Sequence, residues 1–573
     1  MGKIFSKNNM AENLFGQDYA GSLSWERILS FLILCAVIGF LLVLRRPDAV
    51  MNAQFWAEDG RVFFHDAFYH EASLFTPARS YIHFVPRPIA IFANPFPVIY
   101  IPLIYNCFAI LLASICTAWF SLPHFRHIIG SDTLRVVACV LISLIPAAGT
   151  VLMNITNCQW YLFIWCTLAC FQPFSGIKSK IVMLCVYLMF LLSQIITLIL
   201  FPLWVIRAIA VPKDRKISIV FAAAHIIYAL CAVVFLRATS ESSGEFHILN
   251  FLPATVKFIV TRVGLMSLLG AGFVETHIPH NRHTIILAGL FLLIPAIVVI
   301  LRGRDQPGFM IHTAAFLFLT VASVAAFPIF RNRQPPETMY FDVSGARYFF
   351  LGITLFYIWV LDVVGKFRFN SLVRYGALGV LILMVFAATN NIFNVQKFED
   401  TEWPMWAEGF EQVRNTGSKF PFDVPVNPRP WLIPGSGRLP PETVSIVLAK
   451  PSVINEMEWT VSGWRSTGSD SYLSFSLEKP TYVYLAQFRY SLAGNGLNKS
   501  GAVITWRADP SGDFNRGSKI IRLPTLPETG GNEVDQQAII ADRVVEFRIK
   551  VAGNSSEIKF SQIILQVSPS KIR

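Results

Sequence analysis

Long runs of apolar residues are the feature that most constrains what this chain can fold into. A helix needs about 17–25 apolar residues to cross the hydrocarbon core of a bilayer, and about eleven such runs lie within residues 28–393. Hydrophobic residues make up 54% of the chain and charged residues only 15%, a composition typical of integral membrane proteins. We place the predicted spans at 28–44, 98–120, 134–152, 157–173, 181–195, 197–211, 217–236, 284–301, 308–328, 347–364 and 375–393.

Two of these segments leave an alternative open, because residues 181–211 fit either a tight helical hairpin or one long tilted helix. A further apolar segment, 251–270, carries Lys257 and Arg262. Those charges would be costly at the centre of a bilayer, so we expect an interfacial or re-entrant helix there rather than a span.

The apolar character ends near residue 393, which divides the chain into parts of different kind. The last third alternates apolar and polar residues between polar turns, a pattern that predicts a β-sandwich. The first 27 residues are polar and lack the layout of a signal peptide, so the first apolar run is expected to stay in the mature chain. The expected parts are a cytoplasmic tail (1–27), a transmembrane domain (28–393) with a long loop at 45–97, a helix and extended linker (394–440), and a sandwich (441–573).

Basic residues in short loops indicate the orientation. The loops at 178–180, 213–216, 302–304 and 366–369 are basic and fall on the same side as the N-terminus, which we assign to the cytoplasm. With an odd number of spans, the C-terminal domain then lies on the other side. The sequence therefore predicts a polytopic α-helical membrane protein with about eleven transmembrane helices and a C-terminal extracytoplasmic β-sandwich.

The net charge of +12 does not indicate nucleic-acid binding, because the basic residues are scattered among loops between apolar segments. Membrane topology and anionic lipid head groups account for them better. The nine cysteines include no CxxC pair, so neither a disulfide framework nor a cysteine zinc site is expected.

An acidic pair follows the first predicted span, in the stretch "FWAEDGRVFF" (55–64). Glu58 and Asp59 cannot both ionise at low cost in a partly buried site, so the pKa of one of them should rise and make it a candidate general base. The alternative is that both begin a helix and face water, where carboxylates favour the helix dipole.

Arginines on the predicted outer side need an anionic partner, because the positive-inside rule disfavours them there. The segment "ARSYIHFVPRPI" (78–89) and the segment "SGARYFF", at the start of a predicted span, both contain such arginines. A lipid-linked phosphate is the predicted partner, and the alternative is contact with ordinary lipid head groups. The candidate phosphate ligands are Arg79, Arg87, Arg347 and Tyr348, with Tyr81 and His83 as substrate contacts.

The segment "MNITNCQWY" (153–161) gathers amides and an indole at the outer ends of two predicted spans. Such groups suit sugar binding, through hydrogen bonds to hydroxyls and stacking on a ring. Equally, they fit a tight turn and the interfacial aromatic belt. The candidates are Asn154, Asn157, Gln159 and Trp160.

Two groups of histidines were weighed as metal ligands: His65, Asp66, His70 and Glu71, and separately His277, His280 and His283. Neither matches a strong ligand signature, so no metal or other cofactor is predicted to be required, although a divalent cation remains an alternative. The chain also lacks a Walker A loop, a GxSxG elbow and a Rossmann fingerprint, which weighs against ATP-driven transport, serine hydrolysis and dinucleotide chemistry.

Together, "FWAEDGRVFF", "SYIHFVPRP", "MNITNCQWY", "GARYFF" and "VNPRPW" resemble motifs of the GT-C glycosyltransferases, in particular the phage-type glucosyltransferases that modify bacterial O-antigen. The resemblance covers the plan of residues 28–430. It implies an enzyme of the bacterial inner membrane that moves a hexose such as glucose, with inversion, from a polyprenyl-phosphate donor to a periplasmic surface glycan such as O-antigen or lipopolysaccharide. The C-terminal sandwich is similar in layout to carbohydrate-binding modules.

The resemblance also implies roles for individual residues. The acidic residue of the family's first loop maps onto Asp59 or Glu58 as the base, and Arg87 and Arg347 would stabilise the departing phosphate. This chain has Glu-Asp where the family has a lone Asp, so which carboxylate is the base stays open. Two other classes stay as alternatives: a transporter or flippase of lipid-linked sugars, and a membrane O-acyltransferase.

Overall fold

The computed structural model describes most of the chain in two compact units. One unit comprises Met1–Pro95 and Pro102–Glu399, and the other comprises Phe96–Ile101 and Asp400–Arg573. The described residues are 14–16, 24–71, 73–78, 81–145, 151–174, 176–239, 255–270, 273–274, 282–330, 347–367, 371–392, 397–414, 417–428, 431–438, 443–448, 451–460, 463–467, 471–493, 502–507, 521–523, 534–551 and 557–567.

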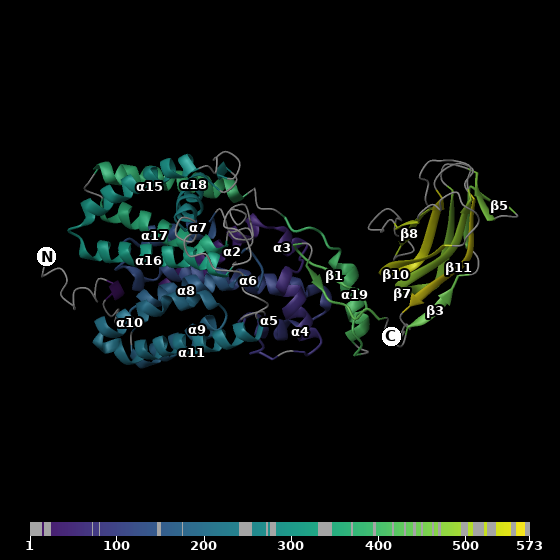
Figure 1. Cartoon of the computed structure of the whole chain (residues 1–573), viewed down its shortest axis with the longest axis horizontal. Helices are drawn as coiled ribbons and strands as arrows, with labels where there is room; N and C mark the ends of the chain where they lie inside the picture. Colours follow the sequence, from purple (N-terminus) through teal and green to yellow (C-terminus); the bar gives the residue numbers. More distant parts are fainter. Residues whose placement is uncertain are drawn as a thin grey trace. The chain divides into compact units, whose positions relative to one another are not determined.

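The first unit is helical (Figure 1). Its longer helices are α2 (Trp25–Arg45), α6 (Ile101–Ala118), α7 (Asp132–Ser143), α8 (Gln159–Phe171), α9 (Gly176–Leu191), α10 (Phe201–Ala210), α11 (Arg215–Thr239), α15 (Arg282–Gly303), α16 (Pro307–Phe330), α17 (Phe350–Lys366) and α18 (Ser371–Ile392). Shorter ones are α3 (Asp48–Met51), η1 (Asp59–Phe64), α4 (His65–Phe68), α5 (Pro86–Ala93), η2 (Val98–Tyr100), η3 (Trp119–Ser121), η4 (Pro123–Phe125), η5 (Ile195–Leu200), η6 (Pro212–Asp214), η7 (Ile259–Leu265) and α13 (Met266–Leu269). The η2 turn belongs to the second unit and leads into α6.

Six helices within the described residues are long and apolar enough to cross a membrane: Trp25–Arg45, Val98–Ser121, Pro212–Val233, Ile285–Gly303, Pro307–Ala325 and Arg347–Lys366. Each of the predicted spans overlaps a helix, but several of these helices are short; α7 has 12 residues and α8 has 13. The apolar helices are therefore compatible with a multi-pass membrane protein, whereas the count of about eleven spans is not confirmed. The expected helix at 251–270 is present as η7 and α13, and it is not among the six.

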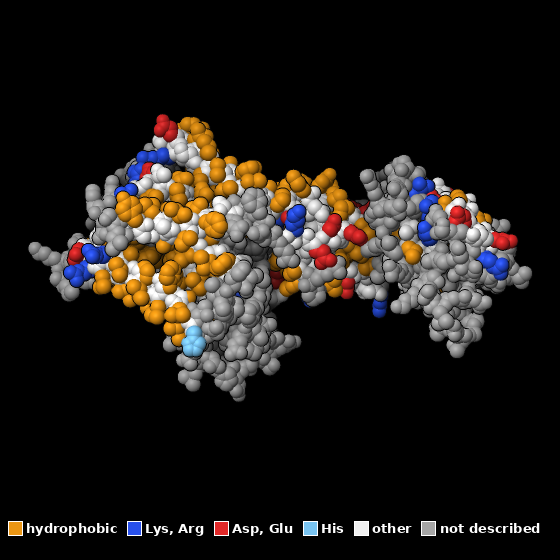
Figure 2. Space-filling view, turned by 90° about the horizontal axis from the view of Figure 1, so that it is seen from above, with side chains coloured by type: hydrophobic (Ala, Val, Ile, Leu, Met, Phe, Trp, Pro, Cys, Tyr) orange, Lys and Arg blue, Asp and Glu red, His pale blue; other side chains and the backbone are white. Residues whose placement is uncertain are grey.

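Hydrophobic side chains cover much of the visible face of the helical unit (Figure 2). On α15, for example, Leu287 and Phe291 are 68% and 64% exposed. Exposure of this extent suits contact with lipid, because a hydrocarbon solvent favours apolar side chains on the outside of a helix bundle.

Two helices of this unit are enclosed by the others. Every residue of α8 and 12 of the 17 residues of α17 are buried, and the two helices pack against each other. Tyr161 and Phe350, in their first turns, make an edge-to-face ring contact with centroids 4.9 Å apart. The N-terminal ends of both helices therefore lie together in the interior, and these ends carry many of the predicted site residues.

The second unit contains the predicted helix, α19 (Trp403–Arg414), a two-stranded sheet and a nine-stranded sheet (Figure 1). The large sheet is ordered β5-β6-β11-β7-β10-β8-β9, with β3 paired to β11 and β4 paired to β7, and every pair is antiparallel. The strands are β1 (Val424–Pro425), β2 (Leu432–Ile433), β3 (Val444–Val447), β4 (Val453–Asn455), β5 (Met457–Thr460), β6 (Gly463–Ser466), β7 (Tyr472–Ala493), β8 (Ala502–Arg507), β9 (Ile521–Leu523), β10 (Val534–Val551) and β11 (Glu557–Val567).

The sequence predicted a C-terminal β domain, and the arrangement of its strands into sheets differs from the prediction. We expected short strands in a sandwich of two sheets, but the strands β3 to β11 form one hydrogen-bonded sheet. The long strands β7 and β10 pair with each other along most of their length. β4 pairs with the first residues of β7, β8 pairs with the last residues of β10, and β9 pairs with β8. β11 pairs with the second half of β7. Register shifts between Ile539 and Asp542 and between Val544 and Glu546 mark where β10 bends, as bulges do in strongly curved sheets. Inward residues such as Phe488, Trp506 and Phe547 form its core.

Candidate functional site

The acidic motif folds inward because its aromatic residues are buried. Phe55, Phe63 and Phe64 are each at most 2% exposed, and Phe55 packs on Tyr105 of α6 at 5.5 Å between ring centroids. Asp59 begins η1, a π-helix, and its side chain is only 1% exposed. The residue does begin a helix, but it does not face water. Single π-turns of this kind are frequent at functional sites.

The Asp59 carboxylate is held by the turn that precedes α8. The backbone N–H of Thr156 donates to Oδ1 at 2.9 Å, the backbone N–H of Ile155 donates to Oδ2 at 3.1 Å, and the Thr156 hydroxyl also donates to Oδ1. All three donors are neutral, and no Lys, Arg or His forms an ion pair with Asp59 in the described parts of the chain. A buried carboxylate of this kind has hydrogen bonds but no countercharge.

Burial decides the protonation of Asp59. It raises the pKa of this group to about 7, against the hydrogen bonds from Thr156 and Ile155, which act to lower it, and with a smaller upward effect from Glu58. The expectation that the acidic pair would contain one group with a raised pKa is met in Asp59. A carboxyl group that titrates near neutral pH can accept a proton in one step and release it in the next.

The turn that holds Asp59 is shaped by Met153 and Asn154. Met153 has a positive φ of 55°. Asn154 Oδ1 accepts from the backbone N–H of Asn157 at 2.8 Å, and its Nδ2 donates to the Leu152 carbonyl at 3.2 Å. Asn side chains commonly close turns in this way. Asn154 thus stabilises the turn from within, and its predicted contact with a sugar stays a prediction.

The same turn reaches the start of α17 through Asn157. Arg347 donates from Nη1 to Asn157 Oδ1 at 3.3 Å, and its guanidinium lies 5.6 Å from the ring centroid of Tyr348. Tyr348 in turn makes an edge-to-face contact with Trp160, with centroids 5.1 Å apart. Residues about 190 positions apart in sequence are therefore neighbours here.

The long loop contributes Tyr81 and His83. The Tyr81 hydroxyl donates to Gln159 Oε1 at 3.3 Å, and the Tyr81 and His83 rings lie 4.1 Å apart. Burial is the main reason that the pKa of Tyr81 is raised, and Tyr348 and Glu58 act in the same direction. The phenol is therefore a neutral donor, and Glu58 lies near enough to Tyr81 to act on its pKa.

Two buried donors of this group have no hydrogen-bond partner among the described residues: Asn157 Nδ2 and Trp160 Nε1. An unsatisfied buried donor costs about 1–3 kcal/mol, so native structures rarely keep one without a reason. Acceptor oxygens of a ligand, such as sugar hydroxyls or a phosphate, would satisfy both.

Arg87 is joined to this group through Phe63, whose ring centroid lies 5.8 Å from the guanidinium and 5.6 Å from the His83 ring. From α5, Arg87 Nη1 pairs with Asp66 Oδ2 of α4 at 3.1 Å, and its Nε and Nη2 are buried without a partner in the described part of the structure. Burial acts to raise the pKa of Asp66, but hydrogen bonds from His65 and Arg87 outweigh it and leave that pKa below its ordinary value. Arg87 thus has a carboxylate partner that the sequence did not reveal, and two of its guanidinium nitrogens remain for an anion.

His65, Asp66 and Glu71 each place a ligand atom within 4.8 Å of the others, so this part of the first histidine group could hold a divalent cation. The donor set of one imidazole and two carboxylates is suitable for a metal. However, the Arg87 guanidinium already neutralises Asp66 and would repel a cation. Of the second histidine group, His277 and His280 lie outside the described residues.

The structure therefore brings together Asp59, Glu58, Tyr81, His83, Gln159, Trp160, Asn157, Arg347 and Tyr348 through the contacts above, and Asn154 through the turn. Arg79 lies outside the described residues. Sequence reasoning missed Thr156, the donor that contacts Asp59 with both backbone and side chain. Its only signal was its place inside "MNITNCQWY".

The apolar helices are compatible with a multi-pass membrane protein, and the N-terminal ends of two of its helices hold a buried carboxylate that has no ion pair among the described residues. No protein-family model and no curated protein matches the sequence. Among solved structures, the chain has a likeness to a rhamnosidase from Klebsiella oxytoca with rhamnose bound, at 15% identity and a TM-score of 0.15. That match covers 22% of this chain and 30% of the rhamnosidase, and it carries no argument about fold or function.

Proposed function

We propose that this protein is an inverting GT-C-type glycosyltransferase that transfers a hexose from a polyprenyl-phosphate donor to a surface glycan on the periplasmic side of a bacterial inner membrane. One observation carries the proposal. A carboxylate that titrates near neutral pH is fixed to the same turn that, through Asn157, contacts an arginine at the start of a membrane helix. A base and a cation held by one rigid element are what displacement of a phosphate by a hydroxyl needs.

In the proposed reaction, Asp59 removes the proton from an acceptor hydroxyl as that oxygen forms a bond to the anomeric carbon. The bond between the anomeric carbon and the phosphate oxygen breaks, and its electron pair leaves with the polyprenyl phosphate. The leaving group is a weak base, so no general acid is needed. Glu58 is the second candidate for the base, since it is next to Asp59 in the chain and acts on the pKa of both Asp59 and Tyr81.

Arg347 is proposed to stabilise the charge that develops on the departing phosphate. Its position at the first residue of a candidate span suits a phosphate at the membrane surface, with the lipid chain in the bilayer. Asn157 holds the guanidinium from one side. Trp160 and Tyr348 form an aromatic pair beside it that could pack on a sugar ring.

The test is a transfer assay with purified full-length protein, polyprenyl-phosphate glucose and candidate glycan acceptors. Wild type should transfer the sugar, and Asp59→Asn should not, while both unfold at the same temperature. Asp305→Asn, which changes an exposed carboxylate outside the site, is the matched control and should transfer normally. If a folded wild-type protein transfers no lipid-linked hexose but moves such lipids across liposomes, the protein is a transporter instead.

A further inference from the structure

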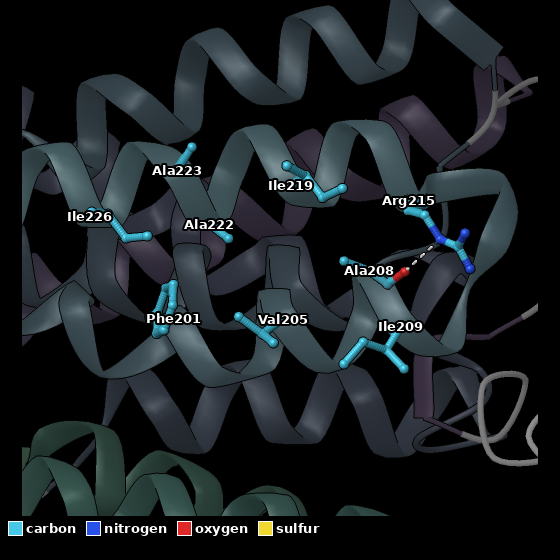
Figure 3. Close-up of a pocket in the computed structure, with 9 residues that line it drawn as sticks. All are labelled: Phe201, Val205, Ala208, Ile209, Arg215, Ile219, Ala222, Ala223 and Ile226. Carbon is cyan, nitrogen blue, oxygen red and sulfur yellow. Dashed lines mark hydrogen bonds between the residues drawn. The ribbon is translucent and has the colours of Figure 1, made fainter.

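A groove between α10 and α11 lies apart from the site described above (Figure 3). It encloses a volume of about 450 Å³ and is lined by apolar side chains, including Phe201, Val205, Ile219 and Ala222. α11 belongs to one of the candidate spans and α10 to a shorter apolar helix. The groove is open along its side, because the lining residue Ile219 is 53% exposed. It therefore faces the region where lipid is expected.

The dimensions of the groove suit one lipid chain. Its lining along α11 extends from Arg215 to Ile226, which is about 16 Å of helix at 1.5 Å per residue. Half of the hydrocarbon core of a bilayer is about 15 Å thick. The apolar lining thus matches the depth of one leaflet, with Arg215 at its end.

Arg215 places positive charge at that end. Its Nε donates to the Ala208 carbonyl of α10 at 3.3 Å, and its terminal nitrogens point away from the apolar lining (Figure 3). Lys213 and Lys216, on either side of it in sequence, are exposed. The charge attracts anions because it is not cancelled by the neighbouring carboxylate.

That carboxylate is Asp214, which is buried and already paired. Arg207 Nη2 lies 2.8 Å from its Oδ2, and Lys180 Nζ lies 2.9 Å from its Oδ1. Asp214 therefore has two cationic partners of its own.

We propose that this groove binds one acyl chain of an anionic phospholipid, whose phosphate is held by Arg215. Apolar packing alone would not favour a protein groove over surrounding lipid tails, so the selectivity comes from the head group. Basic pockets between membrane helices bind anionic head groups in this way, and a guanidinium can hold a phosphate through two hydrogen bonds. The proposal does not depend on the glycosyltransferase reaction.

Native mass spectrometry of the detergent-solubilised full chain tests the head-group contact. The probes are phosphatidylglycerol and phosphatidylcholine with identical acyl chains. Wild type should retain phosphatidylglycerol about five- to tenfold better, and Arg215→Gln should remove that preference. Lys178→Gln, which removes an exposed charge on α9 outside the groove, should keep it.

A second variant tests the groove itself without changing charge. Ala222→Leu fills the hollow and should weaken retention of phosphatidylglycerol, whereas Ala224→Leu, two residues further along α11 and outside the lining, should not. Thermal unfolding checks that both variants fold. Equal retention of the two lipids by wild type, or unchanged retention in both Arg215→Gln and Ala222→Leu, overturns the proposal. Displacement of phosphatidylglycerol by equimolar polyprenyl phosphate also overturns it, since the groove would then belong to that lipid.

Discussion

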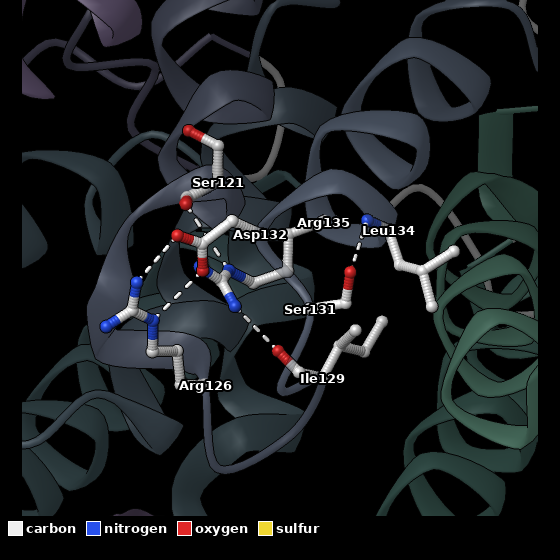
Figure 4. Close-up of polar contacts among 7 residues, drawn as sticks. All are labelled: Ser121, Arg126, Ile129, Ser131, Asp132, Leu134 and Arg135. Carbon is white, nitrogen blue, oxygen red and sulfur yellow. Dashed lines mark hydrogen bonds and ion pairs between the residues drawn. The ribbon is translucent and has the colours of Figure 1, made fainter. Parts of the chain in front are cut away.

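In the helical unit Asp59 begins η1 and Asp132 begins α7, and the partners of these two carboxylates differ. Arg126 binds both oxygens of Asp132, at 2.9 and 2.6 Å, and Arg135 adds a third contact at 2.5 Å (Figure 4). The hydrogen bond from Arg126 is the main reason that the pKa of Asp132 is lowered to about 2. Asp59 also accepts three hydrogen bonds, but from neutral groups and in full burial, and its pKa is raised to about 7.

The comparison teaches that the charge of the partner and the degree of burial, rather than the number of hydrogen bonds or the position in a helix, separate these two carboxyl groups. Asp132 is a structural anion: it neutralises Arg135, which is fully buried and also donates to the Ile129 carbonyl at 2.7 Å. Asp59 is suited to proton transfer. The predictions that follow are ordered from the largest expected effect to the smallest.

Replacing each aspartate by asparagine should show the difference between the two carboxyl groups most clearly. Asp59→Asn removes the proposed base and should lower the rate of transfer by about 10²–10⁴-fold. Asp132→Asn should leave the rate within about twofold, because a group that stays ionised at neutral pH and lies in a separate contact network has no part in proton transfer. Initial rates with polyprenyl-phosphate glucose measure both. Equal losses in the two variants would mean that Asp59 is structural as well.

Removing the Arg347 guanidinium should have the next largest effect. Arg347→Ala takes away the proposed stabilisation of the leaving phosphate and should lower the rate by about 10²–10³-fold, as loss of one transition-state donor does. The control is Arg126→Ala, which removes an arginine that pairs with the Asp132 carboxylate. An unchanged rate in Arg347→Ala would exclude this residue from the reaction.

The hydroxyl of Thr156 should tune the pKa of Asp59. Thr156→Val removes one donor to the carboxylate and should raise that pKa by about one to two units, since a hydrogen bond to a charged group contributes about 1.5–3 kcal/mol. The acidic limb of the transfer-rate profile then moves to higher pH. Thr156→Ser keeps the hydroxyl and should leave the limb in place. Identical profiles for Val and Ser would show that the backbone donors alone set the pKa.

Removing the ion pair between Arg126 and Asp132 should lower the stability of the protein only weakly. Arg126 and Asp132 are 40% and 60% exposed, so Arg126→Gln should change the free energy of unfolding by less than about 1 kcal/mol near neutral pH. The lowered pKa of Asp132 means that its contribution is full above its unfolded pKa and is lost as the pH falls toward about 2. Chemical denaturation at pH 7 and at pH 3 measures the difference, and a large loss at pH 7 would contradict the view of this pair as solvent-exposed.

The sequence predicted what depends on local pattern. Apolar runs located the helices of the first unit, and period-two alternation located strands such as β8 and β11. It could not predict that α7 and α8 are short, because burial inside a bundle permits helices that do not cross a bilayer alone. Nor could it predict the long strands β7 and β10, whose bulges depend on pairing between distant residues.

The sequence indicated which residue types the candidate site contains, but it indicated only part of the contacts between them. The contact of Tyr81 with Gln159 and that of Arg347 with Asn157 join segments whose neighbourhood depends on how α8 and α17 pack. Arg87 was expected to face a phosphate, and its pairing with Asp66 could not be read from a spacing of 21 residues. Thr156 was overlooked because a threonine within an apolar stretch has no chemical signature until its partner is known.

Infrared difference spectroscopy of the protonated carboxyl band tests the central claim most directly, since it needs no substrate. Spectra of wild type minus Asp59→Asn, recorded in lipid as the pH is raised, isolate the Asp59 group. We predict a carboxylic-acid band that disappears with a midpoint at about pH 7. A midpoint near the ordinary aspartate value of about 3.9 would mean that Asp59 is a permanent anion, and the proposed base would be lost.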